Sequence, residues 1–207
     1  MATPEQSKDQ VKQKLLEQSA HLFNTQGYEA TSLQEIAETT GLDEGSILDH
    51  FTDKSDLHHQ ALLWMTTTAI TELVVGIRAG KDFKEKMNNI LDFFQGYATG
   101  QNRDGGCPLM NAAIETYYKT DVMREHTAEM FKVLTDATAM LLRNAIEHKQ
   151  IKANVSTDAW AQFFVSALEG SLLLSKVQGN YIPLNSTVET LREQVRIMAL
   201  QNLHIVH

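Results

Sequence analysis

The scarcity of proline constrains this chain more than any other feature of its sequence. The 207 residues contain only three prolines, Pro4, Pro108 and Pro183, and each lies at an expected segment edge. Between them, apolar residues recur at helical spacing over long runs. Because proline interrupts a helix, long proline-free runs of this kind favour helices. The sequence therefore predicts an all-α protein.

The expected helices are separated by short polar or glycine-containing segments. A first helix ends at Gly27, two short helices follow, and a long helix begins at Thr52 or Asp53 and runs to Gly80. The later helices are expected at residues 82–99, 108–118, 121–149, 156–178 and 186–203.

Side chains that can cap free amides mark several of these helix starts. Ser32 and Glu35 form a capping box, and Asp43 is a good N-cap for the next short helix. A second capping box, Ser186 with Glu189, predicts the start of the last helix.

Composition and cysteine usage indicate a folded cytoplasmic protein. Hydrophobic residues make up 43% of the chain, which is enough for a buried core. Cys107 is the only cysteine and no secretory signal pattern opens the chain, so we expect a reducing environment. The most apolar stretch, residues 160–177, is interrupted by Glu169, Lys176 and other polar residues. We therefore expect a buried helix there and no membrane span.

The net charge of −8 is concentrated at one end of the chain. Residues 1–60 hold four lysines and eleven acidic residues, a net charge of −7, and the other 147 residues carry a net charge of −1. A simple charge argument would say that this end avoids nucleic acid.

Residues 31–50 nevertheless have the form of a helix-turn-helix, with two short capped helices joined by a turn at Gly41. A wider pattern resembles the TetR family of transcriptional regulators. The matching residues are Leu22-Phe23, Gly27-Tyr28, Thr31-Ser32-Leu33, Ile36-Ala37, Gly41-Leu42, Gly45-Ser46-Ile47, His50-Phe51, Lys54 and Leu57.

The resemblance implies a helix-turn-helix DNA-binding domain of three helices over residues 1–53 and a larger helical domain for ligand binding and dimerisation over residues 54–207. It implies a cytoplasmic homodimer that represses transcription from a palindromic double-stranded DNA operator and responds to a small-molecule effector. Effector binding would change the tilt of the fourth helix and so the distance between the two recognition helices, which must match major grooves about 34 Å apart. No catalytic motif and no cofactor site is found, so we do not expect an enzyme.

The resemblance also implies roles for particular residues. Thr31 and Lys54 would contact phosphate, and Gly45 would let the recognition helix approach DNA closely. The full predicted DNA-binding set is Thr31, Ser32, Gly45, Ser46, Asp49, His50 and Lys54.

Several DNA-facing positions depart from the family pattern. Asp43-Glu44 stands where the family has Ser or Thr followed often by Lys or Arg, Leu48 stands where it has tyrosine, and Asp49 adds another acid. Anions weaken phosphate contact, although Asp49 or Glu44 can accept a hydrogen bond from a cytosine amino group. An alternative hypothesis is therefore an acidic domain that has lost operator binding and acts through protein partners.

Aromatic and sulfur-containing residues of the larger domain could surround an effector cavity, although such residues are more often core. The predicted ligand-binding set is Trp64, Met65, Phe93, Tyr97, Cys107, Met110, Asn111, Tyr117, Phe131 and Phe164. Gly106 and Cys107 form a Gly-Cys step at a helix start, where the helix dipole would stabilise a thiolate. A similar step occurs in some electrophile-sensing members of the resembled family; a buried, inert cysteine is the alternative.

The last two helices are expected to pair with those of a second copy as a four-helix bundle. The predicted interface residues are Leu168, Leu172, Leu191, Val195 and Met198. No metal site is predicted, because the adjacent His58 and His59 diverge on a helix and His204 and His207 lie in the terminal tail.

Overall fold

The computed structural model describes residues 4–99, 104–117 and 122–200, and all regular elements in these ranges are helical. This confirms the predicted all-α class. The elements are α1 (Pro4–Gln26), α2 (Leu33–Thr40), α3 (Glu44–Leu48), α4 (Lys54–Ala79), α5 (Phe83–Gln95), the 3₁₀ turn η1 (Gly96–Ala98), α6 (Pro108–Thr116), α7 (Val122–Glu147), α8 (Thr157–Gln178) and α9 (Ile182–Leu200).

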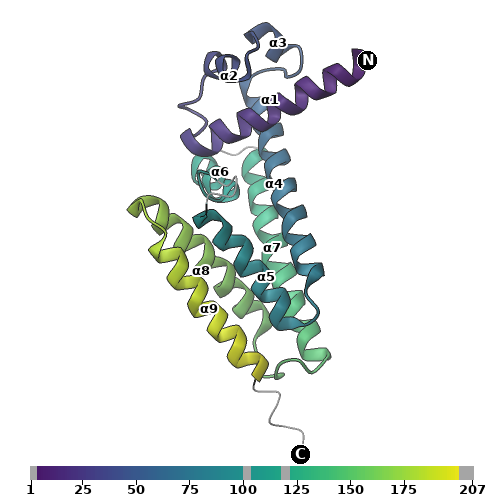
Figure 1. Ribbon diagram of the computed structural model, residues 1–207, viewed down its shortest axis with the longest axis vertical. Helices are drawn as coiled ribbons and strands as arrows, with labels where there is room; N and C mark the ends of the chain where they lie inside the picture. The colour runs from purple at the N-terminus through teal and green to yellow at the C-terminus, as the bar shows by residue number, and fades with distance from the viewer. Residues whose placement is uncertain (1–3, 100–103, 118–121, 201–207) are drawn as a thin grey trace, which may run out of the picture.

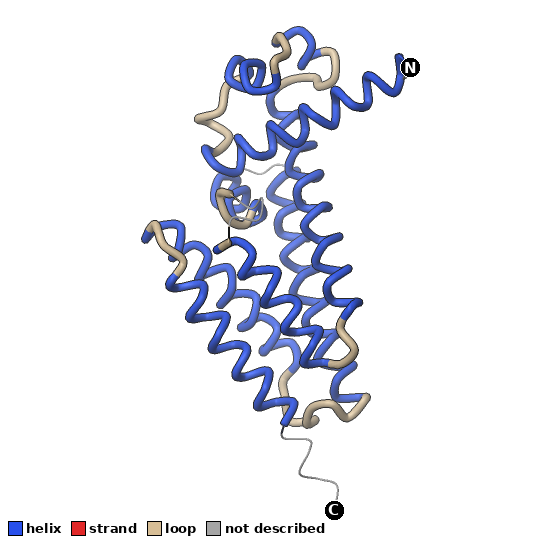
Figure 2. The backbone as a smooth tube through the Cα atoms, in the orientation of Figure 1, coloured by secondary structure: helices blue, strands red, loops and turns tan. Residues whose placement is uncertain are grey.

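The helices form two tiers that share α4 (Figure 1). α1, α2 and α3 form a small tier at one end, and α4 runs from it along the side of the larger tier. α8 and α9 lie side by side on the opposite side (Figure 2). By length and composition alone α4 could span a membrane, but here it packs against α1, α5 and α6.

The small tier has its own core, built from α1, α2, α3 and the first turns of α4. Its fully buried residues include Leu15, Ile36, Ile47 and Leu57. Ala61 of α4 belongs to the same cluster, so this core extends past residue 53 into the long helix.

Side-chain caps explain why the short helices begin where they do. Asp43 accepts a hydrogen bond from the Ser46 amide at 2.8 Å, and Ser32 accepts one from the Glu35 amide at 3.1 Å. The left-handed conformation of Gly41, at φ 69°, ends α2. These caps and this turn confirm the predicted helix-turn-helix.

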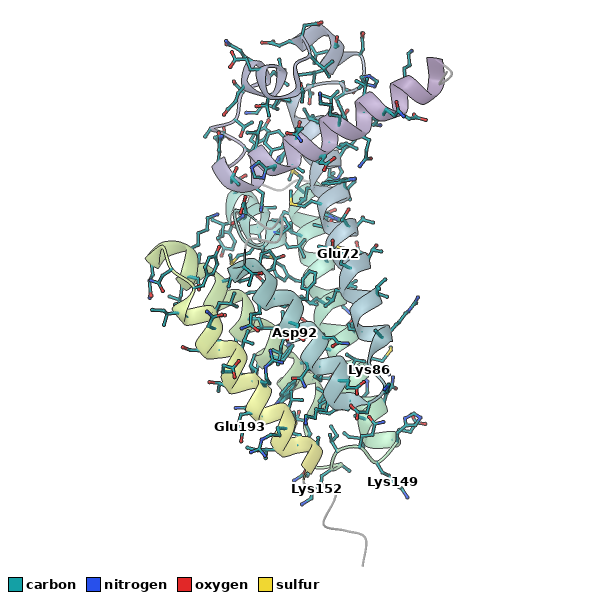
Figure 3. All side chains as sticks on the ribbon, in the orientation of Figure 1. Glu72, Lys86, Asp92, Lys149, Lys152 and Glu193 are labelled. Carbon is teal, nitrogen blue, oxygen red and sulfur yellow. The ribbon has the colours of Figure 1, made fainter. Side chains whose placement is uncertain are left out.

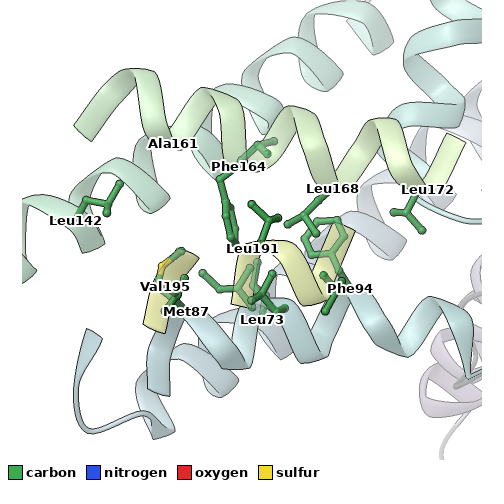
Figure 4. Packing of buried hydrophobic residues seen from close by; sticks show 14 of the residues in the cluster. Leu73, Met87, Phe94, Leu142, Ala161, Phe164, Leu168, Leu172, Leu191 and Val195 are labelled. Carbon is green, nitrogen blue, oxygen red and sulfur yellow. The ribbon is translucent and has the colours of Figure 1, made fainter. Parts of the chain in front are cut away.

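The larger tier packs α5, α7, α8 and α9 around a second core (Figure 4). Leu168 and Leu172 of α8 point into this core, as do Leu191 and Val195 of α9, and each is at most 3% exposed. Met198 packs against its edge. The prediction that Leu168, Leu172, Leu191 and Val195 form a dimer interface is therefore corrected, since the protomer itself covers them. Met198 is only partly buried, so its predicted role is not contradicted.

The start of the last helix also differs from the prediction. α9 begins at Ile182, where the Asn180 side chain accepts the Ile182 amide at 3.0 Å, and Ser186 lies inside the helix. Pro183 fits there because the first helical residues need no amide donor. The Ser186–Glu189 pattern is therefore not an N-terminal capping box.

Candidate functional site

The helix-turn-helix presents an acidic and partly apolar surface. On α3, Glu44, Gly45 and Leu48 are exposed, as is the C-cap Asp49, and the Leu48 side chain is 48% exposed. His50 is half-buried, with its ring 6.4 Å from that of Phe51. A bound DNA duplex would therefore meet two carboxylates on this face.

Asp43 binds the Ser46 hydroxyl, a polar group near the start of α3. Its second carboxylate oxygen accepts a hydrogen bond from the Ser46 hydroxyl at 3.0 Å. Hydrogen bonds from the Ser46 amide and hydroxyl hold the pKa of Asp43 below its usual value. While Ser46 donates its proton to Asp43, its oxygen can only accept, so the hydroxyl is not free to bind a phosphate.

Thr31 does not have its predicted role. Its side chain is 0% exposed and its hydroxyl donates to the carbonyl of Gly27 at 2.8 Å. Thr31 therefore joins the end of α1 to the start of α2. The neighbouring Ser32 is exposed and leaves the first turn of α2 accessible.

Three of the four lysines in residues 1–60 are engaged within the protein. The Lys54 ammonium lies 4.1 Å from the centroid of the Tyr28 ring, and the Lys12 ammonium lies 5.5 Å from that of Phe51. Lys14 donates to the carbonyl of Thr40 at 2.7 Å, at the negative end of α2. A phosphate contact from Lys54 requires its cation–π contact to be exchanged or shared.

The larger tier contains a cavity of about 110 Å³ between α4, α5 and η1, α7 and α8. Its lining is almost entirely apolar, with three aromatic residues from α5 and η1. The lining residues are Thr66, Ala69, Ile70, Leu73, Val74, Ile77, Ile90, Phe93, Phe94, Tyr97, Cys107, Pro108, Leu109, Met130, Val133, Leu134, Ala137, Thr138, Leu141 and Glu169. A cavity of this size and character suits a small apolar or aromatic molecule.

Three of the ten predicted ligand-binding residues, Phe93, Tyr97 and Cys107, line this cavity. Met110, Phe131 and Phe164 instead belong to the large core or pack against it. Trp64 and Met65 pack against the small core. Tyr117 is 69% exposed, and Asn111 lies at the junction of the two tiers. Helical spacing identified the correct helices but not which side of each faces the cavity.

Glu169 is the functional candidate that the prediction missed. Its side chain lines the cavity from α8 and is only 8% exposed, and neither carboxyl oxygen has an N–H or O–H donor among the described residues. The nearby Cys107 thiol is the one weak donor beside it. Burial raises its pKa to about 7. The available signal was its place as the only acidic residue within the most apolar stretch of the chain, 160–177.

The surroundings of Cys107 do not favour a thiolate. Cys107 is the N-cap residue of α6, as expected, but it is buried. Burial first, and then the nearby Glu169 carboxyl, raise the pKa of the thiol well above its usual value. These effects exceed the stabilisation from the helix dipole, so the alternative of a buried, unreactive cysteine is the better description.

Hydrogen bonds join the two tiers beside the cavity. The Asn24 amide at the end of α1 donates to the carbonyls of Asp104 and Gly106, at 2.7 and 3.0 Å. In return, the Asn111 amide of α6 donates to the Asn24 side-chain oxygen at 2.8 Å and to the Gly105 carbonyl at 2.9 Å. This loop leads directly into the segment that lines the cavity from residues 107 to 109.

Two further contacts extend this junction. Lys176 of α8 donates to the Gly105 carbonyl at 3.1 Å and to the Asn111 side-chain oxygen at 3.0 Å. Glu115 of α6 accepts the Tyr28 amide at 3.1 Å. The junction therefore connects α1, α6 and α8.

The described residues contain no group of three or more His, Cys, Asp or Glu side chains that could hold a metal ion. His204 and His207 lie outside the described residues. The rings of His59 and His126 lie 6.4 Å apart, and the pKa of His126 is lowered by burial and then by His59.

The geometry defines a helix-turn-helix regulator with a separate helical domain, and comparison with known proteins identifies the family. Residues 15–61 match the profile of "Bacterial regulatory proteins, tetR family", and residues 84–191 match "Tetracyclin repressor-like, C-terminal domain". The chain belongs to the TetR family of transcriptional regulators and is a DNA-binding regulator, not an enzyme.

Individual relatives cover most of this chain. The HTH-type transcriptional repressor DhaR of Mycobacterium sp. (strain GP1) is 24% identical, over 84% of this chain and 87% of its own length. The regulator LmrA of Bacillus subtilis is 27% identical, over 84% of this chain and 90% of its own. A crystal structure of a TetR transcriptional regulator from Chloroflexus aurantiacus is 26% identical, with a TM-score of 0.85 over 92% of this chain and 96% of that one.

Proposed function

We propose that this protein is a cytoplasmic, homodimeric repressor that releases a palindromic operator when a small effector enters the cavity between α4 and α8. The observation that carries the proposal is the course of α4. Its first turns belong to the core of the helix-turn-helix, through Leu57 and Ala61, and its later turns, from Thr66 to Ile77, line the cavity. A change in cavity contents therefore acts on a helix that supports the DNA-binding face.

The junction supplies a second connection between effector and DNA. The loop before α6 contacts Asn24 at the end of α1, and the next residues line the cavity. Lys176 brings α8 into the same hydrogen-bonded group. We propose that effector binding moves α4 and this loop together and so changes the spacing of the two recognition helices in the dimer.

The exposed face of α8 supports dimerisation. Phe163, Leu173, Leu174 and Val177 lie along one stripe and are 39 to 77% exposed. Gly170 lies on the same stripe, where a small residue lets a second helix approach closely. We propose this stripe as the dimer interface, in place of the predicted interface residues that are buried within the protomer. An exposed apolar surface of this kind is typical of an interface between subunits.

Selection of bound sequences from a random pool of duplex DNA tests the proposal. We expect an enriched palindrome whose half-sites are separated by about one helical turn or a multiple of it. Addition of an effector should release the selected DNA. An unenriched pool would contradict operator recognition.

The acidic face of α3 favours a second candidate, in which the small tier binds a protein partner. Glu44 and Asp49 are exposed there, and Lys12, Lys14 and Lys54 all have intramolecular contacts. Salt titration separates the two candidates. Selective binding with a steep negative dependence on salt supports the repressor, and no binding at about 50 mM salt supports the protein-binding module.

A further inference from the structure

The cavity contains one polar group that the protein leaves poorly compensated. Neither oxygen of the Glu169 carboxyl has an N–H or O–H hydrogen-bond donor among the described residues, although the side chain is only 8% exposed. The one donor beside it is the Cys107 thiol, which is weak. A buried polar group without a partner is costly, and a buried charge without one is more so. This cost is removed if a ligand supplies the missing donors.

We propose that the effector is a small aromatic or apolar amine that binds as an ammonium ion, with Glu169 as its counter-ion. This inference rests on the proposed function, because it names the effector class of the same cavity.

The other groups that face the cavity favour a cation over an anion or a neutral molecule. None of the residues that line it in the described part of the chain is Lys, Arg or His, so no protein cation can neutralise Glu169. Tyr97 and Cys107 are the other titratable residues in the lining. An anionic effector would meet a carboxyl group and no positive charge.

An ammonium group matches this environment in two ways. It carries three donors and a positive charge, so it can satisfy both carboxyl oxygens and neutralise the ion. The hydroxyl group of an alcohol ligand offers only one donor and leaves the negative charge of ionised Glu169 without a counter-ion. Phe93, Phe94 and Tyr97 provide aromatic surface for the apolar part of the ligand and cation–π contacts for its charged end.

The protonation state of Glu169 should make the affinity for an ammonium ion depend on pH. At pH 6 most of the carboxyl is protonated, because burial raises its pKa to about 7, and at pH 8 most of it is ionised. An ammonium ion binds the ionised form. Its affinity should therefore rise about tenfold from pH 6 to pH 8. At pH 7 binding should release about half a proton to the buffer.

Calorimetric titration of the full-length protein tests this with matched probes. Benzylammonium, 2-phenylethylammonium and 3-phenylpropylammonium are each compared with the alcohol of the same length, in two buffers that differ in protonation enthalpy. We expect at least one ammonium probe to bind about tenfold more tightly at pH 8 than at pH 6, with proton release. Its alcohol should bind more weakly and without dependence on pH.

Glu169→Gln keeps the shape of the side chain and removes its charge. It should abolish both the preference for the amine and its pH dependence, while Glu147→Gln, an exposed acid on α7, should leave both unchanged. If Glu169→Gln does not fold, the pH profile and proton release of the wild-type protein still decide the question.

Absence of binding by all three ammonium probes, or equal binding of amine and alcohol at both pH values, would overturn the inference. The titration requires no DNA, so loss of the proposed operator binding would be seen separately in the DNA selection.

Discussion

Among the described residues, only the larger tier of this protein buries an acidic side chain. The small tier has a net charge of −7 over residues 1–60, yet Asp43, Asp53 and Asp56 are engaged with backbone amides at helix starts. The larger tier is nearly neutral and, among its described residues, buries one carboxyl, that of Glu169, with no N–H or O–H donor beside it. The position of an acidic residue therefore says more about function than the net charge of its domain.

The exposed acids of the small tier contribute to local structure. At the start of α4, Asp53 accepts the Asp56 amide, and Asp56 accepts the Thr52 amide and the Gln60 side chain. The Gln60 contact, and then the Thr52 amide, lower the pKa of Asp56. The same arrangement occurs at the start of α5 in the larger tier. There, Asp82 accepts the Glu85 amide, and Glu85 accepts the Lys81 amide. Such acids stabilise helices regardless of what the domain binds.

The large tier also has ordinary surface acids, which makes Glu169 distinctive. Figure 3 shows Asp92 on α5 and Glu193 on α9, on the outer surface of this tier. Arg192 pairs with Asp92 at 2.9 Å, and Arg196 hydrogen-bonds Glu193 at 2.6 Å. Pairs this exposed contribute little to stability.

Placing an acid inside the large tier, instead of on its surface, should have the largest effect. Leu191→Asp puts a carboxylate into a site that is 1% exposed and should destabilise the protomer by more than about 4 kcal/mol. Leu174→Asp, at a site that is 52% exposed, should preserve the helical fold and dissociate the proposed dimer.

Circular dichroism and light scattering measure these two outcomes. Val75→Asp, at an exposed site on α4, is the control for a surface charge and should leave the mass unchanged. A dimeric Leu174→Asp protein would show that the α8 stripe is not the interface.

The pH dependence of stability should distinguish Glu169 from the surface acids. Its folded pKa of about 7 lies above the unfolded value of 4.5, so the folded state binds the proton more tightly. The resulting stabilisation is complete below pH 4.5 and is lost as pH rises through about 7. The difference in unfolding free energy between Glu169→Gln and wild type should therefore shift in favour of the variant by about 3 kcal/mol over this range.

Urea unfolding between pH 4.5 and pH 8 checks this sign. Glu147→Gln should follow the wild-type curve throughout. Parallel curves for Glu169→Gln and wild type would mean that the buried carboxyl titrates as an ordinary surface acid, and the contrast between the tiers would then fail.

The junction between the tiers should be disturbed more by a methyl group at Gly105 than by one at Gly106. Gly105 and Gly106 have φ values of 89° and 84°, so alanine is strained at both. A Cβ atom at Gly105 would collide with the Asn24 carbonyl group, whereas nothing lies within 4 Å of one at Gly106. Gly105→Ala should therefore cost about 2 kcal/mol more than Gly106→Ala in urea unfolding. Equal costs would indicate that the loop moves away from α1 easily.

Neutralising the exposed acids of α3 should have the smallest effect on the folded protein. Glu44→Gln with Asp49→Asn should raise affinity for generic duplex DNA roughly two- to tenfold, because repulsion of phosphate is removed. Glu17→Gln, an exposed acid on α1, is the control. Fluorescence anisotropy at fixed salt measures the change. Tighter generic binding with lost preference for the selected operator would identify these acids as base-reading groups.

The sequence predicted local features well because they depend on neighbours along the chain. Apolar spacing located the helices, and Ser32, Asp43 and Gly41 marked helix ends that the structure confirms. Local pattern failed at Ser186, since the helix had already begun at Ile182. A capping motif is compatible with a helix start but does not require one.

The sites depended on contacts between distant residues. Thr31 fits the family pattern of a phosphate contact but is buried against Gly27. Leu191 and Val195 form an apolar seam, and only the arrangement of α5, α8 and α9 shows that it packs inside the protomer. Helical periodicity shows that a helix has an apolar side, but it does not show which surface covers it.

By itself, the sequence determined the all-α class, the helix-turn-helix and the resemblance to the TetR family, because these follow from spacing, capping and turn chemistry. The tertiary structure alone decided which side chains meet. It buried Cys107 and Glu169 together beside an apolar cavity, and it joined Asn24 to Asn111 across 87 positions of the chain. Burial changes the cost of a charge, and burial is a property of the packed fold.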